Sequence, residues 1–230
     1  ADEIVDTFHD YPKEALLQRF REDTFRAIDE GISLNPVLHA FQQVVHRYGI
    51  ETELIEAFLH SMEMDLTNAS YNTGGYETYI YGSAEVVGLM CVRVFCEGDD
   101  EKYRRLKEPA CRLGAAFQKI NFLRDIKSDF DERGRVYFPG VDFGQFTNEV
   151  KRDIEADIKA DFDAALDGIR RLPEGSRFGV YLAYKYYTHL FAKIRNAPAQ
   201  IVAQERFRLS DKRKIYLLFS SAVRHRFNFL

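Results

Sequence analysis

Residues 118–130, QKINFLRDIKSDF, carry two patterns at once. Apolar side chains recur at helical spacing, while Asn121, Asp125 and Asp129 follow one another at intervals of four and stack on one helix face. Two carboxylates four residues apart cost a helix about 0.2–0.5 kcal/mol. The residues DERG at 131–134 indicate that the helix ends just beyond this stretch. Because the helix dipole is negative at its C-terminus, each acid there costs about 0.3–1 kcal/mol more. A bound cation would reverse both effects, so the stretch predicts a long helix that carries a metal site.

Helical periodicity extends from this stretch over almost the whole chain, and no pair of β-strands is indicated. Neither a low-complexity linker nor an internal repeat separates the segments. The sequence therefore predicts an all-α fold in which residues 1–230 form a single domain, a helical bundle. The predicted helical segments are 12–28, 36–45, 54–62, 76–95, 103–129, 146–172, 178–194 and 212–227.

Composition excludes several classes of protein. A net charge of −4 gives no bulk attraction to nucleic acid. Cys91, Cys96 and Cys111 are odd in number and form no CxxC pair, so we expect buried, reduced thiols and neither a zinc site nor a disulfide framework. The apolar run 86–96 contains Arg93 and falls short of the roughly 20 residues that span a bilayer. Without a signal peptide, the expected location is cytoplasmic.

A second acid pair, Asp2 and Asp6 in DEIVD, repeats the four-residue spacing. Oxygen ligands without His or Cys suit Mg²⁺, which is usually shared with substrate phosphates. Two such clusters facing each other across a bundle would hold metal ions over a diphosphate, and Arg124 would fork onto a diphosphate oxygen. Helices rich in aromatic residues, with 19 Phe and 13 Tyr in the chain, would line an apolar cavity whose aromatic faces can stabilise a carbocation, although most of these side chains are expected simply to pack the core.

Four segments together resemble the squalene and phytoene synthase family, the head-to-head trans-prenyltransferases. LGAAFQKINFLRD at 113–125, which closes with Asp129, is similar to the second aspartate-rich signature of the family. RVYFP at 135–139 is similar to its RxYxP element. YIYGSAEVVGLM at 79–90 resembles the central tyrosine–glycine helix, and 206–214 resembles the closing segment. The resemblance implies an isoprenoid-synthase-type helical bundle around a central cavity.

The resemblance also implies roles for individual residues. The implied ligands of Mg²⁺, or alternatively Mn²⁺, are Asp2, Asp6, Asn121, Asp125 and Asp129. The implied substrate contacts are Gln118, Arg124 and Arg135. The implied catalytic residues are Tyr79, which would act near the carbocation or in proton handling, and Arg124. From the acid spacing alone, Asp125→Ala is expected to leave the fold intact or slightly more stable without metal.

This chain departs from the family pattern at three places. Ser128 stands where members often carry Glu, and Ile201 stands near the position of a tyrosine that some members use. The chain also begins at the first acid motif, so we expect it to lack the family's N-terminal helix. Asp2 and Asp6 are accordingly expected to bind Mg²⁺ more weakly than the second motif does.

The resemblance implies three alternative functions, of which the first is favoured. In the first, a bacterial-type phytoene synthase condenses two geranylgeranyl diphosphates head to head through a cyclopropyl diphosphate, with magnesium and without NADPH. In the second, a squalene or dehydrosqualene synthase uses farnesyl diphosphate. In the third, a non-catalytic relative serves as a scaffold. The depth of the cavity decides between the two substrates, and the sequence does not give it.

The expected partners follow from the same resemblance. Prenyl diphosphates are the expected substrates, and no nucleic acid or obligate protein partner is expected. Because the substrate is amphiphilic and the product apolar, we expect peripheral contact with the inner face of a membrane. The aromatic and basic segment 212–227 is the candidate contact.

Overall fold

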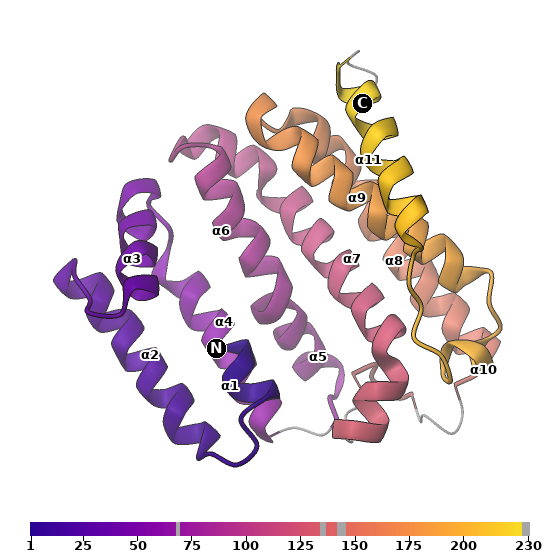
Figure 1. Cartoon of the computed structure of the whole chain (residues 1–230), viewed down its shortest axis with the longest axis horizontal. Coiled ribbons are helices and arrows are strands. Elements are labelled where there is room, and N and C mark those ends of the chain that lie inside the picture. The colour runs from indigo at the N-terminus through magenta and orange to yellow at the C-terminus, as the bar shows by residue number, and fades with distance from the viewer. Residues whose placement is uncertain (68–69, 134–136, 142–145, 227–230) are drawn as a thin grey trace.

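The computed structural model describes residues 1–67, 70–133, 137–141 and 146–226. Within these ranges every regular element is helical, as Figure 1 shows, which confirms the all-α prediction. The elements are α1 (Asp2–Asp6), α2 (Lys13–Glu30), α3 (Pro36–Tyr48), α4 (Thr52–Thr67), α5 (Thr73–Ile80), a π-helical turn η1 (Tyr81–Glu85), α6 (Val86–Phe95), α7 (Asp100–Arg133), α8 (Asn148–Arg171), α9 (Glu174–Arg195), α10 (Ala199–Val202) and α11 (Asp211–Arg226).

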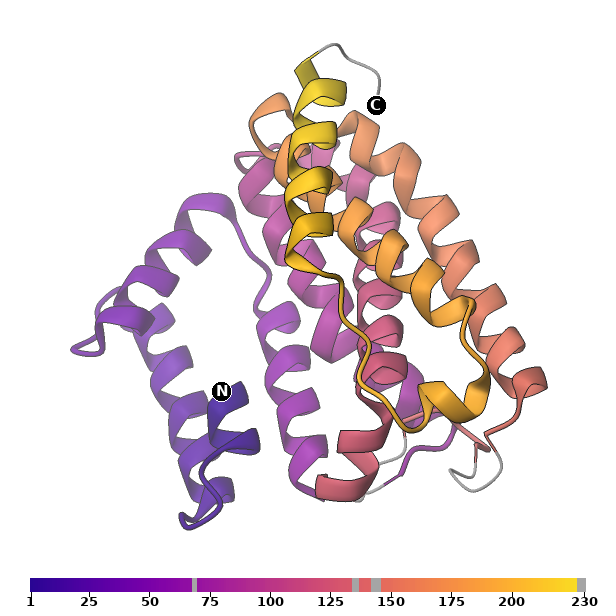
Figure 2. The ribbon, with the colours of Figure 1, turned by 45° about the vertical axis from the view of Figure 1, so that its right-hand side comes forward.

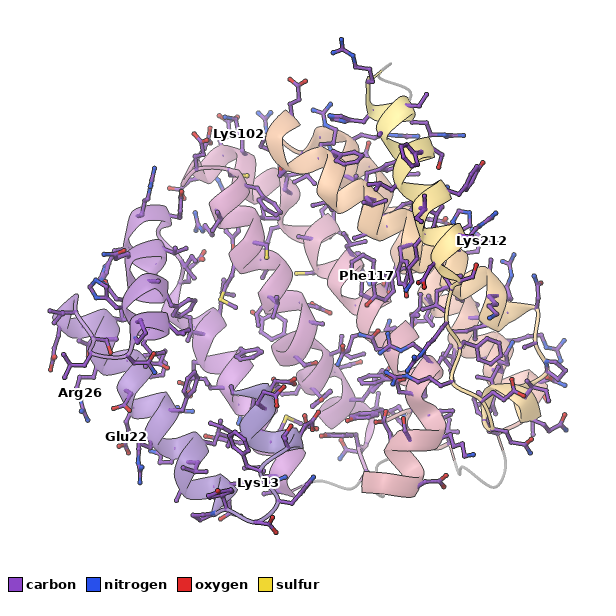
Figure 3. The ribbon with its side chains drawn as sticks, in the orientation of Figure 1. Lys13, Glu22, Arg26, Lys102, Phe117 and Lys212 are labelled. Atoms are coloured by element: carbon purple, nitrogen blue, oxygen red, sulfur yellow. The ribbon has the colours of Figure 1, made fainter. Side chains whose placement is uncertain are left out.

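The long helix α7 is the centre of the bundle. It packs against α6 and η1 on one side and against α8 and α9 on the other, and α11 packs on α9 (Figures 1 and 2). Ile120 and Leu123 of α7 are completely buried in the largest apolar cluster. Figure 3 shows Phe117 in the middle of the bundle, while Lys13 and Lys102 lie at its edges. The apolar spacing that predicted helix 103–129 thus marks the helix that is buried on several sides.

The segment predicted as one helix over 76–95 is divided by the π-helical turn η1. Gly82 in this turn lies against α4, where an added Cβ would come within 2.4 Å of the Ala57 carbonyl oxygen. Ser83 donates a hydrogen bond from its hydroxyl to the Tyr79 carbonyl at 2.7 Å. A π-turn inserts one residue into the helical repeat, so the side chains of α6 are rotated relative to those of α5. Apolar periodicity does not reveal such an insertion.

Small residues allow the central helices to approach closely. A Cβ added to Gly114 of α7 would lie 2.6 Å from the Ala84 carbonyl oxygen, so only glycine fits at this contact with η1. A Cβ added to Gly168 of α8 would lie 2.2 Å from the Cβ of Pro109, the proline inside α7. Because Gly114 and Gly168 carry no Cβ, α7 can approach η1 and α8 closely at these two points.

The expectation that all three cysteines are buried is wrong. Cys96 is buried, but Cys111 is partly exposed and Cys91 is exposed. Cys91 lies on the side of α6 that faces a cavity rather than the packed core. Burial, followed by the nearby Glu85, raises the pKa of the Cys111 thiol to about 12.

No helix within the described ranges is both long enough and apolar enough to cross a membrane.

Candidate active site

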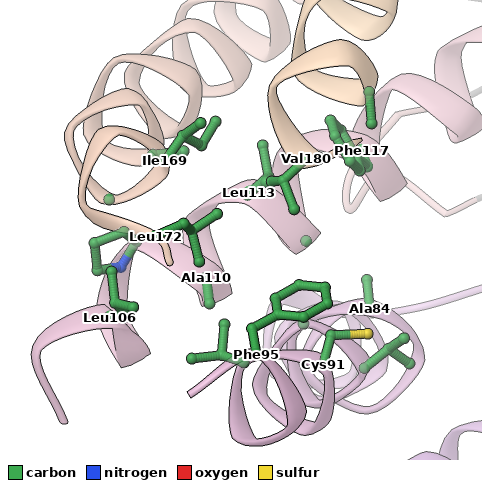
Figure 4. A pocket seen from close by; sticks show the side chains of 18 of the residues that line it. Ala84, Cys91, Phe95, Leu106, Ala110, Leu113, Phe117, Ile169, Leu172 and Val180 are labelled. Atoms are coloured by element: carbon green, nitrogen blue, oxygen red, sulfur yellow. The ribbon is translucent and has the colours of Figure 1, made fainter. Parts of the chain in front are cut away.

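A cavity of about 660 Å³ lies between α6, α7, α8 and α9. Its walls are mostly aliphatic and aromatic side chains and glycine backbone. In the close-up of Figure 4, Phe95 and Cys91 of α6 lie on one side, and Leu113 of α7 and Val180 of α9 lie on the other. The volume falls within the range of about 300–1,000 Å³ that is usual for sites of small organic ligands. The space therefore suits an apolar molecule of substantial size.

Helix α7 runs along the cavity and gives it two different ends. Its cavity-lining residues extend from Leu106 to Asn121, which at 1.5 Å per residue is about 22 Å of helix. Leu106 is surrounded by apolar residues, whereas Gln118 and Asn121 place amide groups at the other end. Asp125 and Asp129 follow on α7 about one and two turns beyond Asn121. The arrangement is an apolar chamber with a polar end that leads toward two carboxylates.

Asn121 is held at this polar end by two neighbours. The Tyr187 hydroxyl of α9 donates to Asn121 Oδ1 at 3.2 Å, and Asn121 Nδ2 donates to Gln118 Oε1 at 3.4 Å. The ring of Tyr187 stacks on Phe117, with centroids 4.0 Å apart and an interplanar angle of 20°. Tyr187, Phe117, Gln118 and Asn121 all line the cavity. Tyr187 is 66 residues from Asn121 in the sequence, and no local motif predicted this contact.

Asp125 lies between two arginines. Arg124 Nε donates to both carboxylate oxygens, at 3.1 and 3.0 Å, and Arg206 Nε lies 2.7 Å from Asp125 Oδ1. These hydrogen bonds to Asp125 are the largest effect on Arg124 and raise its pKa. The sequence predicted that Arg124 would fork onto a diphosphate. In the structure this fork binds the neighbouring carboxylate.

Arg206 is placed by the chain segment between α10 and α11. Phe207 and Leu209 point inward and are buried, while Arg206 and Arg208 between them are exposed. Lys193 of α9 fixes the segment further, since its Nζ donates to the Arg208 carbonyl at 2.8 Å and lies over the Phe207 ring. The alternation in RFRLS thus directs Arg206 to Asp125. In the sequence, the one signal for this segment was that residues 206–214 resemble the closing segment of the family.

Buried ion pairs fix the orientation of α7 against α8. Lys119, only 8% exposed, donates to Asp161 Oδ2 at 2.7 Å and also pairs with Asp157. Asp161 is 1% exposed and accepts a second bond from Arg112 at 3.2 Å. Because Lys119 lies next to Gln118 on the helix, this contact helps to keep the neighbouring amides directed toward the cavity. Sequence reasoning missed Lys119 and Asp161, although Lys119 lies within the signature stretch.

The donor chemistry of Asn121, Asp125 and Asp129 fits a hard divalent cation, because all three offer oxygen atoms from one helix face. Asp129 is only 5% exposed. The structure does not gather the two acid motifs into one site: across the described ranges, no three His, Cys, Asp or Glu side chains are grouped to hold a metal ion. Helix α1, with Asp2 exposed and Asp6 half-buried, packs against α2 and α4 instead. Metal binding by these five residues stays a prediction.

Tyr79 has a well-defined environment away from the cavity lining. It is 4% exposed, and its hydroxyl donates to Asp65 Oδ2 at 2.7 Å. Its ring packs against Phe122 and Tyr137, with centroids 5.9 and 5.3 Å away. Burial, followed by the charge of Asp65, raises the pKa of Tyr79. The catalytic assignment of Tyr79 stays a prediction, and Arg135 lies outside the described residues.

Comparison with known proteins identifies the family to which the chain is similar. The family model described as squalene/phytoene synthase matches residues 1–213. The phytoene synthase of Pseudescherichia vulneris is 34% identical over 139 residues, which cover 56% of this chain and 43% of that protein. The phytoene synthase of Rhodobacter capsulatus is 30% identical over 206 residues, which cover 82% and 59% of the two chains.

Among solved structures, a dehydrosqualene synthase crystallised with a ligand aligns with a TM-score of 0.79 at 19% identity, over 96% of this chain and 81% of that one. This likeness concerns the fold, and it confirms the expected isoprenoid-synthase-type bundle. The chain spans about half the length of the curated relatives it matches. Because the family match extends over 213 of 230 residues, the chain belongs to the squalene/phytoene synthase family.

Proposed function

We propose that this chain carries the catalytic site of a magnesium-dependent prenyltransferase that condenses two geranylgeranyl diphosphates head to head, through a cyclopropyl diphosphate, to phytoene. One observation carries the proposal: an apolar cavity of about 660 Å³ ends at Gln118 and Asn121, and Asp125, which is bound by two arginines, follows about one turn further along α7. A prenyl diphosphate has the same polarity, an apolar chain joined to an anionic head group.

The polar end binds and orients the head group in this proposal. Arg124 and Arg206 exchange their bonds to Asp125 for bonds to diphosphate oxygens, since guanidinium groups bind carboxylate and phosphate alike. Asn121, Asp125 and Asp129 would hold Mg²⁺ through their oxygen atoms. Bound magnesium would neutralise the charge that builds on the departing diphosphate. Gln118 contacts the head group from the cavity side.

The apolar part of the cavity holds the prenyl chains and excludes water. The stacked rings of Phe117 and Tyr187 line its wall near the polar end, where an allylic cation would form once the diphosphate departs. Aromatic faces attract positive charge by about 0.5–2 kcal/mol. Excluding water also prevents the cation from being hydrolysed. Loss of a proton ends the reaction, so NADPH is not required.

The nature of the prenyl substrate is tested directly by product analysis. Purified protein is incubated with Mg²⁺ and geranylgeranyl or farnesyl diphosphate, each with and without NADPH. Phytoene from geranylgeranyl diphosphate without NADPH supports the proposal. A C30 product from farnesyl diphosphate alone would identify a squalene or dehydrosqualene synthase instead. Absence of any condensation product would favour a non-catalytic scaffold.

We further propose that α11 places the protein on an anionic membrane surface. Its exposed face carries the large apolar side chains Ile215, Tyr216, Leu218, Phe219 and Val223. Its two ends carry five basic side chains, Lys212, Arg213, Lys214, Arg224 and Arg226, against one acid, Asp211. Lys212 lies at the outer start of the helix in Figure 3. Basic amphipathic helices bind anionic lipid through buried apolar area together with charge attraction.

Vesicle flotation tests this surface. We expect the protein to float with phosphatidylglycerol vesicles but not with phosphatidylcholine vesicles, and to be released by salt. Phe219→Glu should abolish flotation. Ile32→Glu, at a residue that is 58% exposed in the connection between α2 and α3, should leave it unchanged, because these two helices lie across the molecule from α11 (Figure 1). Concentration-dependent self-association without flotation would show that the α11 face binds a second copy of the protein instead.

A further inference from the structure

We propose that Tyr187 is a positioning residue that, together with Gln118, holds the Asn121 side-chain amide in the orientation that presents Oδ1 as the ligand oxygen. The inference rests on the proposed magnesium-dependent function. It concerns a tyrosine of α9 that neither the acid motifs nor the family resemblance singled out.

The hydrogen bonds around Asn121 distinguish its side-chain oxygen, Oδ1, from its side-chain nitrogen, Nδ2. The Tyr187 hydroxyl donates to Oδ1 at 3.2 Å, while Nδ2 donates to the side-chain oxygen Oε1 of Gln118 at 3.4 Å. Reversing the Asn121 amide would place two carbonyl oxygens against each other, unless the Gln118 amide reversed as well. Gln118 Oε1, which can only accept, therefore favours the observed orientation, and the Tyr187 hydroxyl stabilises that orientation by donating to Oδ1.

Orientation matters for Asn121 in a way that it does not for its neighbours. A carboxylate presents an oxygen whichever way it turns, so Asp125 and Asp129 need no such control. An amide presents either an oxygen or an NH₂ group, and only the oxygen ligates a hard cation. Groups that orient a ligand in this way typically change metal affinity or activity about 10–100-fold when they are removed.

The ring of Tyr187 is itself fixed, which gives its hydroxyl a defined position. It stacks on Phe117 at 4.0 Å and packs edge-on against Tyr186 at 5.5 Å. Both Tyr187 and Asn121 line the cavity, so the hydroxyl acts at the boundary between the apolar chamber and the acid face. The Tyr79 hydroxyl, by contrast, is bonded to Asp65. Phenylalanine at position 187 would keep the stacking and lose only the hydrogen bond.

The test compares Tyr187→Phe with Tyr184→Phe. Tyr184 lies three residues earlier on α9 and packs edge-on against Phe162, so Tyr184→Phe removes a hydroxyl from the same helix at another place. Calorimetric titration with Mn²⁺ in the presence of inorganic pyrophosphate measures the dissociation constant of the metal, and circular dichroism checks the fold. We expect Tyr187→Phe to raise this constant about 10–100-fold and Tyr184→Phe to leave it unchanged.

A double-mutant cycle separates orientation from other effects. In an Asn121→Asp background the ligand is a carboxylate, so adding Tyr187→Phe should no longer weaken metal binding. An equal loss in both backgrounds would overturn the inference, because the hydroxyl would then act without orienting the amide. So would an unchanged dissociation constant in Tyr187→Phe.

The outcomes also separate this inference from the proposed function. If the wild-type protein binds Mn²⁺ with pyrophosphate and turns over prenyl diphosphate while Tyr187→Phe behaves identically, only the role of Tyr187 is overturned. If the wild-type protein binds no metal with pyrophosphate and forms no product, the proposed function fails and the inference falls with it.

Discussion

The two acid motifs have the same spacing and different surroundings. Asp2 and Asp6 lie on α1, a helix of five residues, with Asp2 exposed and Asp6 half-buried. Asp125 and Asp129 lie on α7, a helix of 34 residues; Asp129 is 5% exposed, and two arginines bind Asp125. The DxxxD spacing predicted that the two carboxylates of each motif share a helix face, and both motifs do lie on helices. What the spacing did not predict is which pair has a cavity and cations beside it.

Arg124 and Arg206 also change the energetic argument about α7. Taken as an isolated helix, the acid stripe only costs stability, which led to the expectation that Asp125→Ala is harmless without metal. In the folded chain the Asp125 carboxylate has two guanidinium partners, so its removal leaves both arginines without that partner. Four measurements test the contrast between the two motifs.

The largest effect is expected on turnover. Asp125→Asn and Asp129→Asn should each lower kcat at least about a hundredfold, because they remove charge that holds the metal against the departing diphosphate. Asp2→Asn and Asp6→Asn should lower it less. Steady-state kinetics of all four variants with geranylgeranyl diphosphate measures this. Equal losses at the two motifs would show that both hold the metal equally well and would remove the distinction.

The second effect is ligand-induced stabilisation. At about 100 times the dissociation constant, Mg²⁺ with pyrophosphate should stabilise the wild-type protein by about 2.7 kcal/mol. For a chain of this size, that raises Tm by about 5–10 °C. Differential scanning calorimetry should find this shift absent in Asp125→Asn and retained in Asp2→Asn. A shift that persists in Asp125→Asn would place the metal elsewhere.

The third effect is on pyrophosphate affinity. Arg206→Gln should weaken binding of pyrophosphate about tenfold, which corresponds to about 1.4 kcal/mol, because one charged donor is lost. Arg208→Gln is the matched control. Arg208 is an exposed arginine of the same segment, on the other side of the buried Phe207 from Arg206. Isothermal titration in the presence of Mg²⁺ compares the two. Equal weakening in both variants would indicate a general charge effect.

The smallest effect concerns stability without ligands. Asp125→Ala should lower the free energy of unfolding by about 1–2 kcal/mol, because charged hydrogen bonds at a partly buried carboxylate are lost. Asp2→Ala, at an exposed side chain, should stay within about 0.5 kcal/mol of the wild type. Urea unfolding followed by circular dichroism measures both. A more stable Asp125→Ala variant would restore the expectation drawn from the sequence and show that the arginines contribute little.

Some residues of the site were accessible from the sequence and others were not. Asn121, Asp125 and Gln118 lie within one helical stretch, so their shared face follows from a period of 3.6 residues. Tyr187 and Arg206 lie more than 60 residues away from Asn121 and Asp125, to which they bind, and no local rule connects them. The π-turn at Tyr81–Glu85 was missed for a related reason, since apolar spacing looks nearly the same with one residue inserted.

The sequence by itself determined that the chain is all-α, that a long apolar helix runs through residues 103–129, and that two acid pairs lie on helix faces. These properties depend on local spacing, which short-range backbone geometry converts directly into structure. Tertiary structure alone decided that α6, α7, α8 and α9 enclose a cavity, that Asp125 lies between two arginines, and that Tyr187 reaches Asn121. These properties depend on how far helices approach and how they rotate against one another. Side-chain volumes such as the missing Cβ of Gly114 set that packing through contacts between segments distant in the chain.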